Sequence, residues 1–130
     1  MIVGIGIDVC AIARIQDALD RWGDRLWVRV LTESERQTLA ERFDRATALA
    51  GRFAAKEAIV KAMAGAPGVS WHDLEVRGGK KQPPVAVLHG PARARADKMG
   101  VERVHVSITH DAGVAAAVAI LEGMARGELV

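Results

Sequence analysis

The chain has 130 residues, of which 50% are apolar and 26% are charged, a composition that suits one soluble domain with its own core. Its 18 basic and 16 acidic residues leave a net charge of +2, and a 4% share of aromatic residues offers little for base stacking, which argues against a nucleic-acid partner. The sequence starts without a charged leader, has no apolar run of about 18 residues that could cross a membrane, and has one cysteine, too few for an internal disulfide. We expect one cytoplasmic domain over residues 1–130, without membrane contact.

The first half of the chain predicts one strand followed by helices. Alternating β-branched residues predict a strand at 2–8. Apolar residues at helical spacing predict a helix at 11–22, ended by a glycine. Thr32 and Glu35 form a possible capping box that opens a second helix at 32–43. An alanine-rich stretch predicts a long third helix at 45–64.

The second half predicts more strands than helices. A polar loop at 78–84, rich in glycine and proline, separates two short strands. The expected elements are strands at 73–77 and 85–88, a helix at 90–99, strands at 103–109 and 114–121, and a loose tail at 123–130. The strand at 114–121 is apolar on both faces, which predicts that both faces are buried.

Glu57 lies in an unusual place on the expected long helix. On a helical wheel it falls near the middle of an apolar stripe formed by Ala46, Leu49, Ala50, Phe53, Val60 and Ala64. An ionised carboxylate there is costly unless it is paired or binds a metal. Lys61 lies one turn later and could pair with it without any function. The wheel alone leaves the ion pair and the functional site both open.

Asp8 ends the first strand on the same face as two glycines. Gly4, Gly6 and Asp8 share this face, and the two glycines leave room for a helix or a ligand to approach. Asp8 could simply cap the helix near residue 11. If instead the long helix packs on the glycine face, Asp8 and Glu57 converge. Two carboxylates then suit Mg²⁺, which commonly adds water and substrate phosphates as ligands, and a nearby lysine would neutralise phosphate charge.

Three segments together resemble the holo-acyl carrier protein synthase family. They are Gly4-Ile5-Gly6-Ile7-Asp8, then Arg52-Phe53-Ala54-Ala55-Lys56-Glu57-Ala58 with Lys61, then His105-Val106-Ser107-Ile108-Thr109-His110. The match keeps the family's order and spacing over most of the chain. One stretch departs from it, because Gln82-Pro83-Pro84 stands where many relatives have Gly-x-Pro. We therefore carry over no contact from the 78–84 loop.

The resemblance implies an enzyme of fatty acid biosynthesis. The family is a 4′-phosphopantetheinyl transferase: it moves phosphopantetheine from coenzyme A to a serine of apo-acyl carrier protein and releases adenosine 3′,5′-bisphosphate. It implies an α+β fold with an antiparallel sheet packed against a long helix, and a homotrimer whose sites lie between subunits. Asp8 and Glu57 are then the magnesium ligands. Lys61 and His110 are then catalytic and contact coenzyme A.

Histidines and arginines complete the set of candidates. From the residues alone, His110 beside the turn fits the commoner case of a structural histidine bonded to the backbone. His105 is expected to be structural, and His72 and His89 to lie on the surface. Arg14, Arg21 and Arg25 would line one face if the helical turn continued past Gly23, and we expect them to dock the acidic carrier protein. Rival functions are a non-catalytic carrier- or nucleotide-binding module and a magnesium-dependent phosphoryl or pyrophosphate hydrolase.

Overall fold

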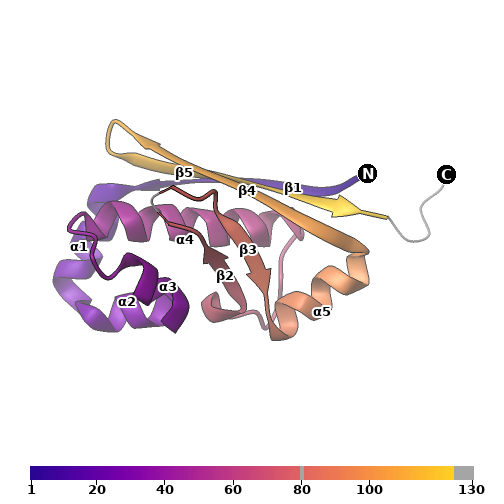
Figure 1. Cartoon of the computed structure of the whole chain (residues 1–130), viewed down its shortest axis with the longest axis horizontal. Helices are drawn as coiled ribbons and strands as arrows, with labels where there is room; N and C mark the ends of the chain where they lie inside the picture. Colours follow the sequence, from indigo (N-terminus) through magenta and orange to yellow (C-terminus); the bar gives the residue numbers. More distant parts are fainter. Residues whose placement is uncertain (80, 125–130) are drawn as a thin grey trace.

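The computed structural model describes residues 1–79 and 81–124. Its elements in chain order are β1 (Ile2–Ala11), α1 (Ile12–Trp22), α2 (Asp24–Val30), α3 (Glu33–Leu39), α4 (Arg45–Ala62), the 3-10 turn η1 (Trp71–Asp73), β2 (Leu74–Arg77), β3 (Val85–Leu88), α5 (Gly90–Met99), β4 (Val101–Asp111) and β5 (Val114–Gly123). An antiparallel sheet in the order β1-β5-β4 covers one face of α4, and α1 to α3 with the β2–β3 hairpin lie on the other side (Figure 1). The predicted α+β architecture is confirmed.

Several boundaries differ from expectation, and β1 and β4 are each longer than the predicted strands. The predicted second helix is shorter, because Thr32 and Glu35 do form the capping box but α3 ends at Leu39. The seven-residue helix α2 was not predicted, and Gly23, at φ 58°, separates it from α1. Gly123 closes β5, so the strand extends into the predicted tail; residues 125–130 lie outside the described residues. No described helix is both long and apolar enough to cross a membrane.

The glycines of β1 let α4 lie directly on the strand. A Cβ atom at Gly6 would stand 2.0 Å from the carbonyl oxygen of Ala58, and one at Gly4 would stand 2.1 Å from that of Ala62. Both distances exclude any side chain, so the helix backbone rests on the strand backbone. This contact confirms the predicted packing of the long helix on the glycine face, and it brings the second half of α4 beside Asp8.

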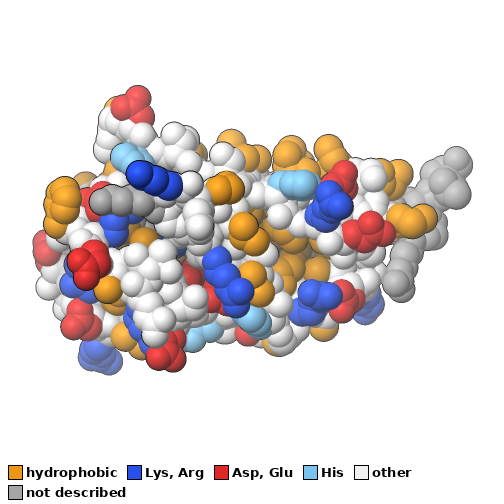
Figure 2. All heavy atoms as spheres, in the orientation of Figure 1, with side chains coloured by type: hydrophobic (Ala, Val, Ile, Leu, Met, Phe, Trp, Pro, Cys, Tyr) orange, Lys and Arg blue, Asp and Glu red, His pale blue; other side chains and the backbone are white. Residues whose placement is uncertain are grey.

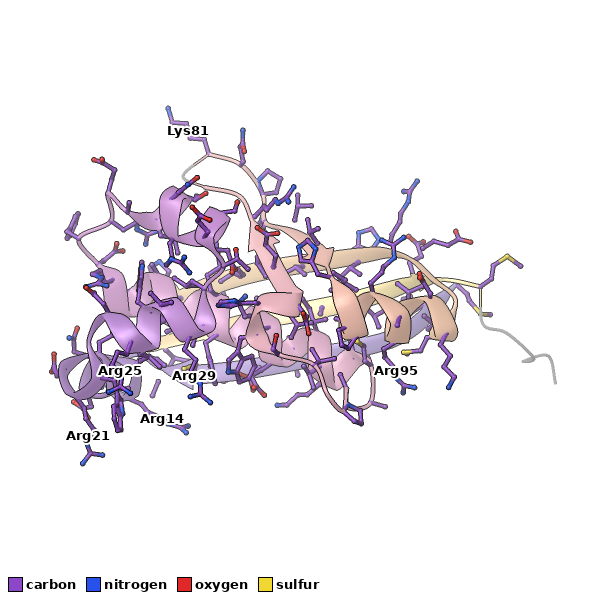
Figure 3. All side chains as sticks on the ribbon, turned by 90° about the horizontal axis from the view of Figure 1, so that it is seen from below. Arg14, Arg21, Arg25, Arg29, Lys81 and Arg95 are labelled. Atoms are coloured by element: carbon purple, nitrogen blue, oxygen red, sulfur yellow. The ribbon has the colours of Figure 1, made fainter. Side chains whose placement is uncertain are left out.

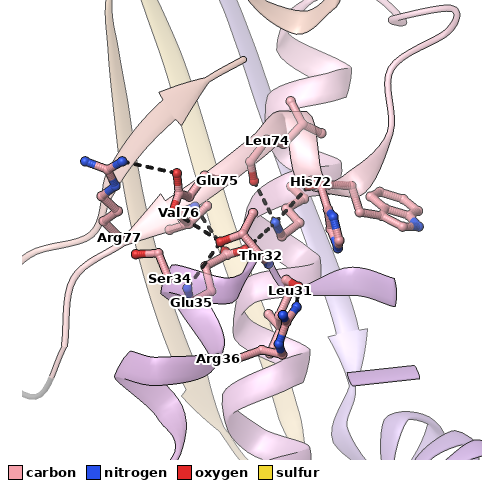
Figure 4. Close-up of polar contacts among 12 residues, drawn as sticks. Leu31, Thr32, Ser34, Glu35, Arg36, His72, Leu74, Glu75, Val76 and Arg77 are labelled. Carbon is pink, nitrogen blue, oxygen red and sulfur yellow. Dashed lines mark hydrogen bonds and ion pairs between the residues drawn. The ribbon is translucent and has the colours of Figure 1, made fainter. Parts of the chain in front are cut away.

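A buried ionic network fixes the opposite side of α4. The Lys56 ammonium is fully buried and donates to Glu35 Oε1 at 2.9 Å, to the Trp71 carbonyl at 2.9 Å and to the Leu74 carbonyl at 2.7 Å (Figure 4). The other carboxylate oxygen of Glu35 accepts from the backbone N–H of Val76 at 3.0 Å. Every proton of the ammonium therefore has an acceptor, which a buried charge requires. The network sets the rotation of α4 and turns the neighbouring Glu57 the other way.

The outer face of the three-stranded sheet is apolar and uncovered within one chain. Ile5, Ile7 and Val9 of β1 pair laterally with Ile120, Val118 and Ala116 of β5. The three β1 side chains are 64%, 64% and 62% exposed. Figure 2 shows hydrophobic side chains along the upper margin of the molecule, over this sheet. The prediction that both faces of 114–121 are buried is therefore wrong for a single chain: Ala115, Ala117 and Ala119 are buried, and the other face is only half-buried.

Candidate functional site

Asp8 and Lys61 form the centre of the candidate site. Asp8 lies on the inner face of β1, and the Lys61 ammonium in the last turn of α4 donates to Asp8 Oδ1 at 3.0 Å and to the Ile7 carbonyl at 3.2 Å. The N-cap of α1 is Ala11, without a side-chain hydrogen bond, so Asp8 does not cap that helix. Lys61 pairs with Asp8 rather than with Glu57. Both simple structural explanations for these carboxylates are therefore wrong.

Glu57 shares the electrostatic environment of Asp8. Burial raises the pKa of the Glu57 carboxyl first, the nearby Asp8 raises it further, and Lys61 only partly opposes them. Two carboxylates that repel one another, beside one lysine, form a site that gains from an added cation. No third histidine, cysteine or acid joins them into a metal cluster among the described residues. Two hard oxygen donors fit Mg²⁺, which keeps water and phosphate ligands, better than Zn²⁺ held by a full protein ligand set.

His110 lies at the other edge of the sheet. It is directly opposite Ala115 of β5, which in turn pairs with Cys10 of β1, so β5 separates the His110 strand from the Asp8 strand. Two strand spacings correspond to about 10 Å. His110 is exposed and makes no side-chain hydrogen bond to a described residue. A single chain therefore does not bring His110 to Asp8, Glu57 and Lys61.

A cavity of about 540 Å³ opens on the His110 side of α4. Its lining includes Arg42, Phe43, Asp44, Arg52, Gly78 and Ile108. Arg42 is already paired, since its Nε and Nη2 atoms donate to both carboxylate oxygens of Asp44 at 2.5 and 2.6 Å. These hydrogen bonds hold the pKa of Asp44 below its usual value. Ile108, two residues before His110 on β4, lines the cavity, so His110 lies close to it.

Arg52 is the cavity residue with unused hydrogen-bonding capacity. One guanidinium nitrogen donates to the Gly78 carbonyl at 2.6 Å, while its buried Nε has no hydrogen-bond partner among the described residues. Burial lowers the pKa of this guanidinium, although arginine remains charged in proteins. A buried donor without an acceptor is costly, so an anionic ligand that reaches Arg52 would be stabilised there. No sequence pattern indicated this cavity, because its walls come from segments that are distant along the chain.

Arginines gather where α1 meets α2. Figure 3 draws Arg14, Arg21, Arg25 and Arg29 at this end of the molecule. The helical turn does not continue past Gly23, so Arg25 belongs to α2 and the predicted continuous stripe is wrong. The guanidinium groups of Arg21 and Arg25 nevertheless both lie over the exposed Trp22 ring, at 5.9 and 6.0 Å from its centroid. Beside them is an apolar groove of about 720 Å³, lined by Trp22, Leu26 and Val28.

The remaining histidines lie on the surface and contact nearby groups. His72 lies 2.7 Å from the Val28 carbonyl, and His89 lies 2.8 Å from Glu75. His105 lies 3.0 Å from Glu122 across β4 and β5. These positions agree with the expected structural and surface roles, and none of the three joins the site around Asp8.

The sequence matches the family model described as the 4′-phosphopantetheinyl transferase superfamily over residues 4–119. A holo-[acyl-carrier-protein] synthase from Anaeromyxobacter sp. (strain K) is 50% identical over 126 residues, which cover 95% of this chain and 98% of the relative. The enzyme of the same description from Solidesulfovibrio magneticus is 48% identical over 125 residues, which cover 95% of this chain and all of the relative (100%).

Solved structures show the same fold. The holo-(acyl-carrier-protein) synthase from Bacillus anthracis, in complex with CoA (3′,5′-ADP), is 37% identical, has a TM-score of 0.75, and aligns over 95% of this chain and 99% of its own. The Helicobacter pylori enzyme in complex with coenzyme A is 32% identical with a TM-score of 0.77, over 91% of this chain and 99% of its own. The chain therefore belongs to the holo-[acyl-carrier-protein] synthase family of the 4′-phosphopantetheinyl transferase superfamily.

Proposed function

We propose that this chain transfers the 4′-phosphopantetheine group of coenzyme A to a serine of apo-acyl carrier protein, in the cytoplasm and in support of fatty acid biosynthesis. The observation that carries the proposal is the cluster of Asp8, Glu57 and Lys61, in a chain that its relatives match over almost its whole length. Two carboxylates and one lysine at the surface have the donor set and charge to hold a metal-bound pyrophosphate.

Asp8 and Glu57 would hold Mg²⁺, which when bound offsets the charge of the pyrophosphate oxygens. The carrier serine oxygen attacks the β-phosphorus of coenzyme A, and the serine hydroxyl proton passes to water. The bond from that phosphorus to the bridging oxygen breaks, and adenosine 3′,5′-bisphosphate leaves with the electron pair. The Lys61 ammonium, 3.0 Å from Asp8, supplies positive charge beside the leaving oxygen. This role makes Lys61 a catalytic residue that also contacts coenzyme A.

The apolar outer face of the sheet suggests assembly into a homotrimer. Exposed Ile5, Ile7 and Val9 form a contiguous surface with the half-buried side chains of β5, and such surfaces commonly mark interfaces. The sheet has β1 and β4 at its edges. A head-to-tail ring contact brings the β1 edge of one subunit beside the β4 edge of the next. Asp8 would then face His110 of the partner subunit, across the subunit boundary.

The cavity beside His110 is our candidate for the nucleotide end of coenzyme A. Arg52 lines this cavity, and its guanidinium group can bind a phosphate there. In a ring, a coenzyme A whose pyrophosphate lies at Asp8 and Glu57 of one subunit can extend into the cavity of the next. His110 would contact coenzyme A at this boundary.

The arginine cluster at α1 and α2 is our candidate dock for the carrier protein. Arg14, Arg21 and Arg25, with Arg29 added by the structure, combine with the apolar groove beside Trp22. An acidic amphipathic helix would satisfy both the charge and the apolar surface.

A transfer assay tests the proposed reaction. The protein is incubated with coenzyme A, Mg²⁺ and apo-acyl carrier protein, and the carrier is weighed by mass spectrometry. We expect a gain equal to one phosphopantetheine group, which is lost with EDTA and in folded Asp8→Ala and Glu57→Ala variants. A carrier of unchanged mass would favour a binding module, and hydrolysis of coenzyme A without transfer would favour a hydrolase.

A further inference from the structure

Lys56 and Glu35 form an ion pair that is closed off from water. Both side chains are 0% exposed, and Lys56 Nζ lies 2.9 Å from Glu35 Oε1. Apolar side chains of similar volume are often as stabilising as a buried ion pair, or more so, because burying two charges costs much of what their attraction contributes. Stability alone therefore does not account for this pair. The best-attested use of such buried polar groups is to hold neighbouring elements in one register.

Helix α4 is an element that needs such a register. Seven of its eleven buried residues are alanines, and short side chains interdigitate too little to select a single packing arrangement. The contact with β1 is made by the helix backbone, since the carbonyl oxygens of Ala58 and Ala62 face Gly6 and Gly4. This contact sets the distance between helix and strand, but small groups alone distinguish poorly between neighbouring rotations of the helix about its axis.

The hydrogen bonds of the ion pair supply this rotational constraint. The Lys56 ammonium also donates to the carbonyl oxygens of Trp71 at 2.9 Å and of Leu74 at 2.7 Å. Glu35 Oε2 accepts from the backbone N–H of Val76 at 3.0 Å. The partners of Lys56 thus come from α3, η1 and β2, so that one side chain holds α4 against three other elements (Figure 4). A rotated α4 would break several charge-assisted hydrogen bonds at once, inside a region without water to replace them.

We propose that Lys56 and Glu35 are positioning residues, which aim Glu57 at Asp8 and so determine the affinity of this site for its divalent cation. The inference rests on the proposed function. Glu57 follows Lys56 directly and projects about 100° further around the helix, so a fixed Lys56 also fixes the direction of Glu57. Turning α4 by one such step would direct Glu57 away from Asp8. The ion pair acts through the helix rather than by contact, because neither of its side chains is exposed.

Removing both charges together tests this role without leaving either charge unpaired. In Lys56→Met/Glu35→Gln the side-chain volumes are nearly kept, so the fold should persist. Mn²⁺ takes the same oxygen ligands as Mg²⁺, and its binding in the absence of coenzyme A is measured by the loss of the free-ion signal in electron paramagnetic resonance. We expect the dissociation constant for Mn²⁺ to rise roughly 10- to 100-fold, as when a group that orients a metal ligand is removed. The Mg²⁺ concentration for half-maximal transfer should rise similarly, with KM for the carrier protein unchanged.

Leu49→Ala is the matched control, because Leu49 is buried on the same helix, about two turns before Lys56. It should lower stability in urea denaturation and leave the affinity for Mn²⁺ unchanged. If the double variant does not fold, Glu35→Gln alone decides the question, since Lys56 keeps its two carbonyl partners and the dissociation constant should still rise more than about twofold.

The proposal is overturned if the folded variant binds Mn²⁺ within about twofold of the parent protein. It is also overturned if Leu49→Ala loses as much affinity, because the effect would then reflect a general loss of stability. A parent protein that binds no Mn²⁺ and transfers nothing from coenzyme A would instead contradict the proposed function, which is a distinct result.

Discussion

At the scale of single residues, the carboxylate of Glu57 is destabilised by its surroundings in the metal-free chain. Burial and Asp8 raise its pKa, and Lys61, which is hydrogen-bonded to Asp8, only partly compensates. A carboxyl whose pKa is higher in the folded than in the unfolded state contributes stability below the unfolded pKa and loses it as the pH rises through the folded pKa. At neutral pH, ionised Glu57 therefore costs stability, and a bound cation would remove that cost.

Glu57→Gln should consequently raise the Tm of the metal-free protein at neutral pH, by no more than a few degrees. The gain should shrink as the pH falls through the raised pKa of Glu57, because the parent carboxyl becomes neutral too. Added Mg²⁺ should stabilise the parent protein and not the variant, because the metal would lose one of its two protein ligands. Differential scanning fluorimetry with and without Mg²⁺, across about pH 4 to 8, measures both effects.

Glu102→Gln is the matched control, since Glu102 is an exposed acid on β4. It should change neither the metal-free Tm nor the response to Mg²⁺. A lower metal-free Tm for Glu57→Gln, or an undiminished response to Mg²⁺, would contradict the assignment of Glu57 as a metal ligand.

At the scale of elements, the contact between β1 and α4 decides whether the site can form. Asp8 follows the two glycines that let the helix approach, and Lys61 reaches Asp8 only because that approach is close. Gly6→Ala should lower the free energy of unfolding by about 3 kcal/mol or more, because the added Cβ has to displace the Ala58 carbonyl at 2.0 Å. Urea denaturation at fixed protein concentration measures the loss.

Gly51→Ala is a control within the same helix. Its Cβ would meet only the Cγ2 methyl group of Ile108, at 3.1 Å, and alanine gains about 1 kcal/mol of helix propensity. We expect a much smaller change in stability. Equal effects of the two substitutions would mean that the close approach of β1 and α4 is not the critical contact.

We predict that the carrier protein docks on α1 and α2. Reversing charge in Arg21→Glu/Arg25→Glu should raise KM for the carrier about tenfold or more, with little change in KM for coenzyme A, because the cluster lies apart from the cavity. The difference from the parent should shrink at high salt, which screens the attraction. Lys98→Glu on α5, an exposed cation outside the cluster, is the control. An unchanged carrier KM in a steady-state assay would remove this surface from the proposal.

Prediction from the sequence succeeded for elements in which apolar residues repeat over many positions and lie on one face. The alternation in β1 predicted the glycine face that carries Asp8, and the structure confirms the expected packing of the long helix on this face. The roles of Asp8 and Glu57 as metal ligands stay predictions. Helix α2 was missed because seven residues carry too short an apolar pattern. Burial of Lys56 was missed because α4 is enclosed on several sides, and a single apolar stripe does not reveal a buried ion pair with Glu35.

At the scale of the whole molecule, the two halves of the candidate site lie at opposite edges of one sheet. Asp8 and Lys61 lie beside β1, whereas His110 and the cavity with Arg52 lie beside β4. No spacing in the sequence reveals this separation, because it depends on strand order. A closed ring of three chains would unite each β1 edge with the β4 edge of the next subunit and would cover the apolar outer face.

Subunit mixing tests this arrangement directly. Asp8→Ala should inactivate the metal side of every site, and Arg52→Gln should weaken the nucleotide side; each variant alone should transfer little at low coenzyme A concentration. The two variants are then unfolded, mixed in equal amounts and refolded together. An active site in a mixed ring takes its intact Asp8 from an Arg52→Gln subunit and its intact Arg52 from an Asp8→Ala subunit. Random assembly in a ring gives roughly a quarter of sites with both, so activity should return to about that fraction of the parent protein.

Sites built within single chains would gain nothing on mixing, because every chain would still carry one defect. As a control, the subunits within each variant's own trimers are chemically cross-linked before mixing, so that the two variants cannot exchange subunits. This should abolish the recovery of activity. Recovery that persists after cross-linking would show contamination rather than shared sites.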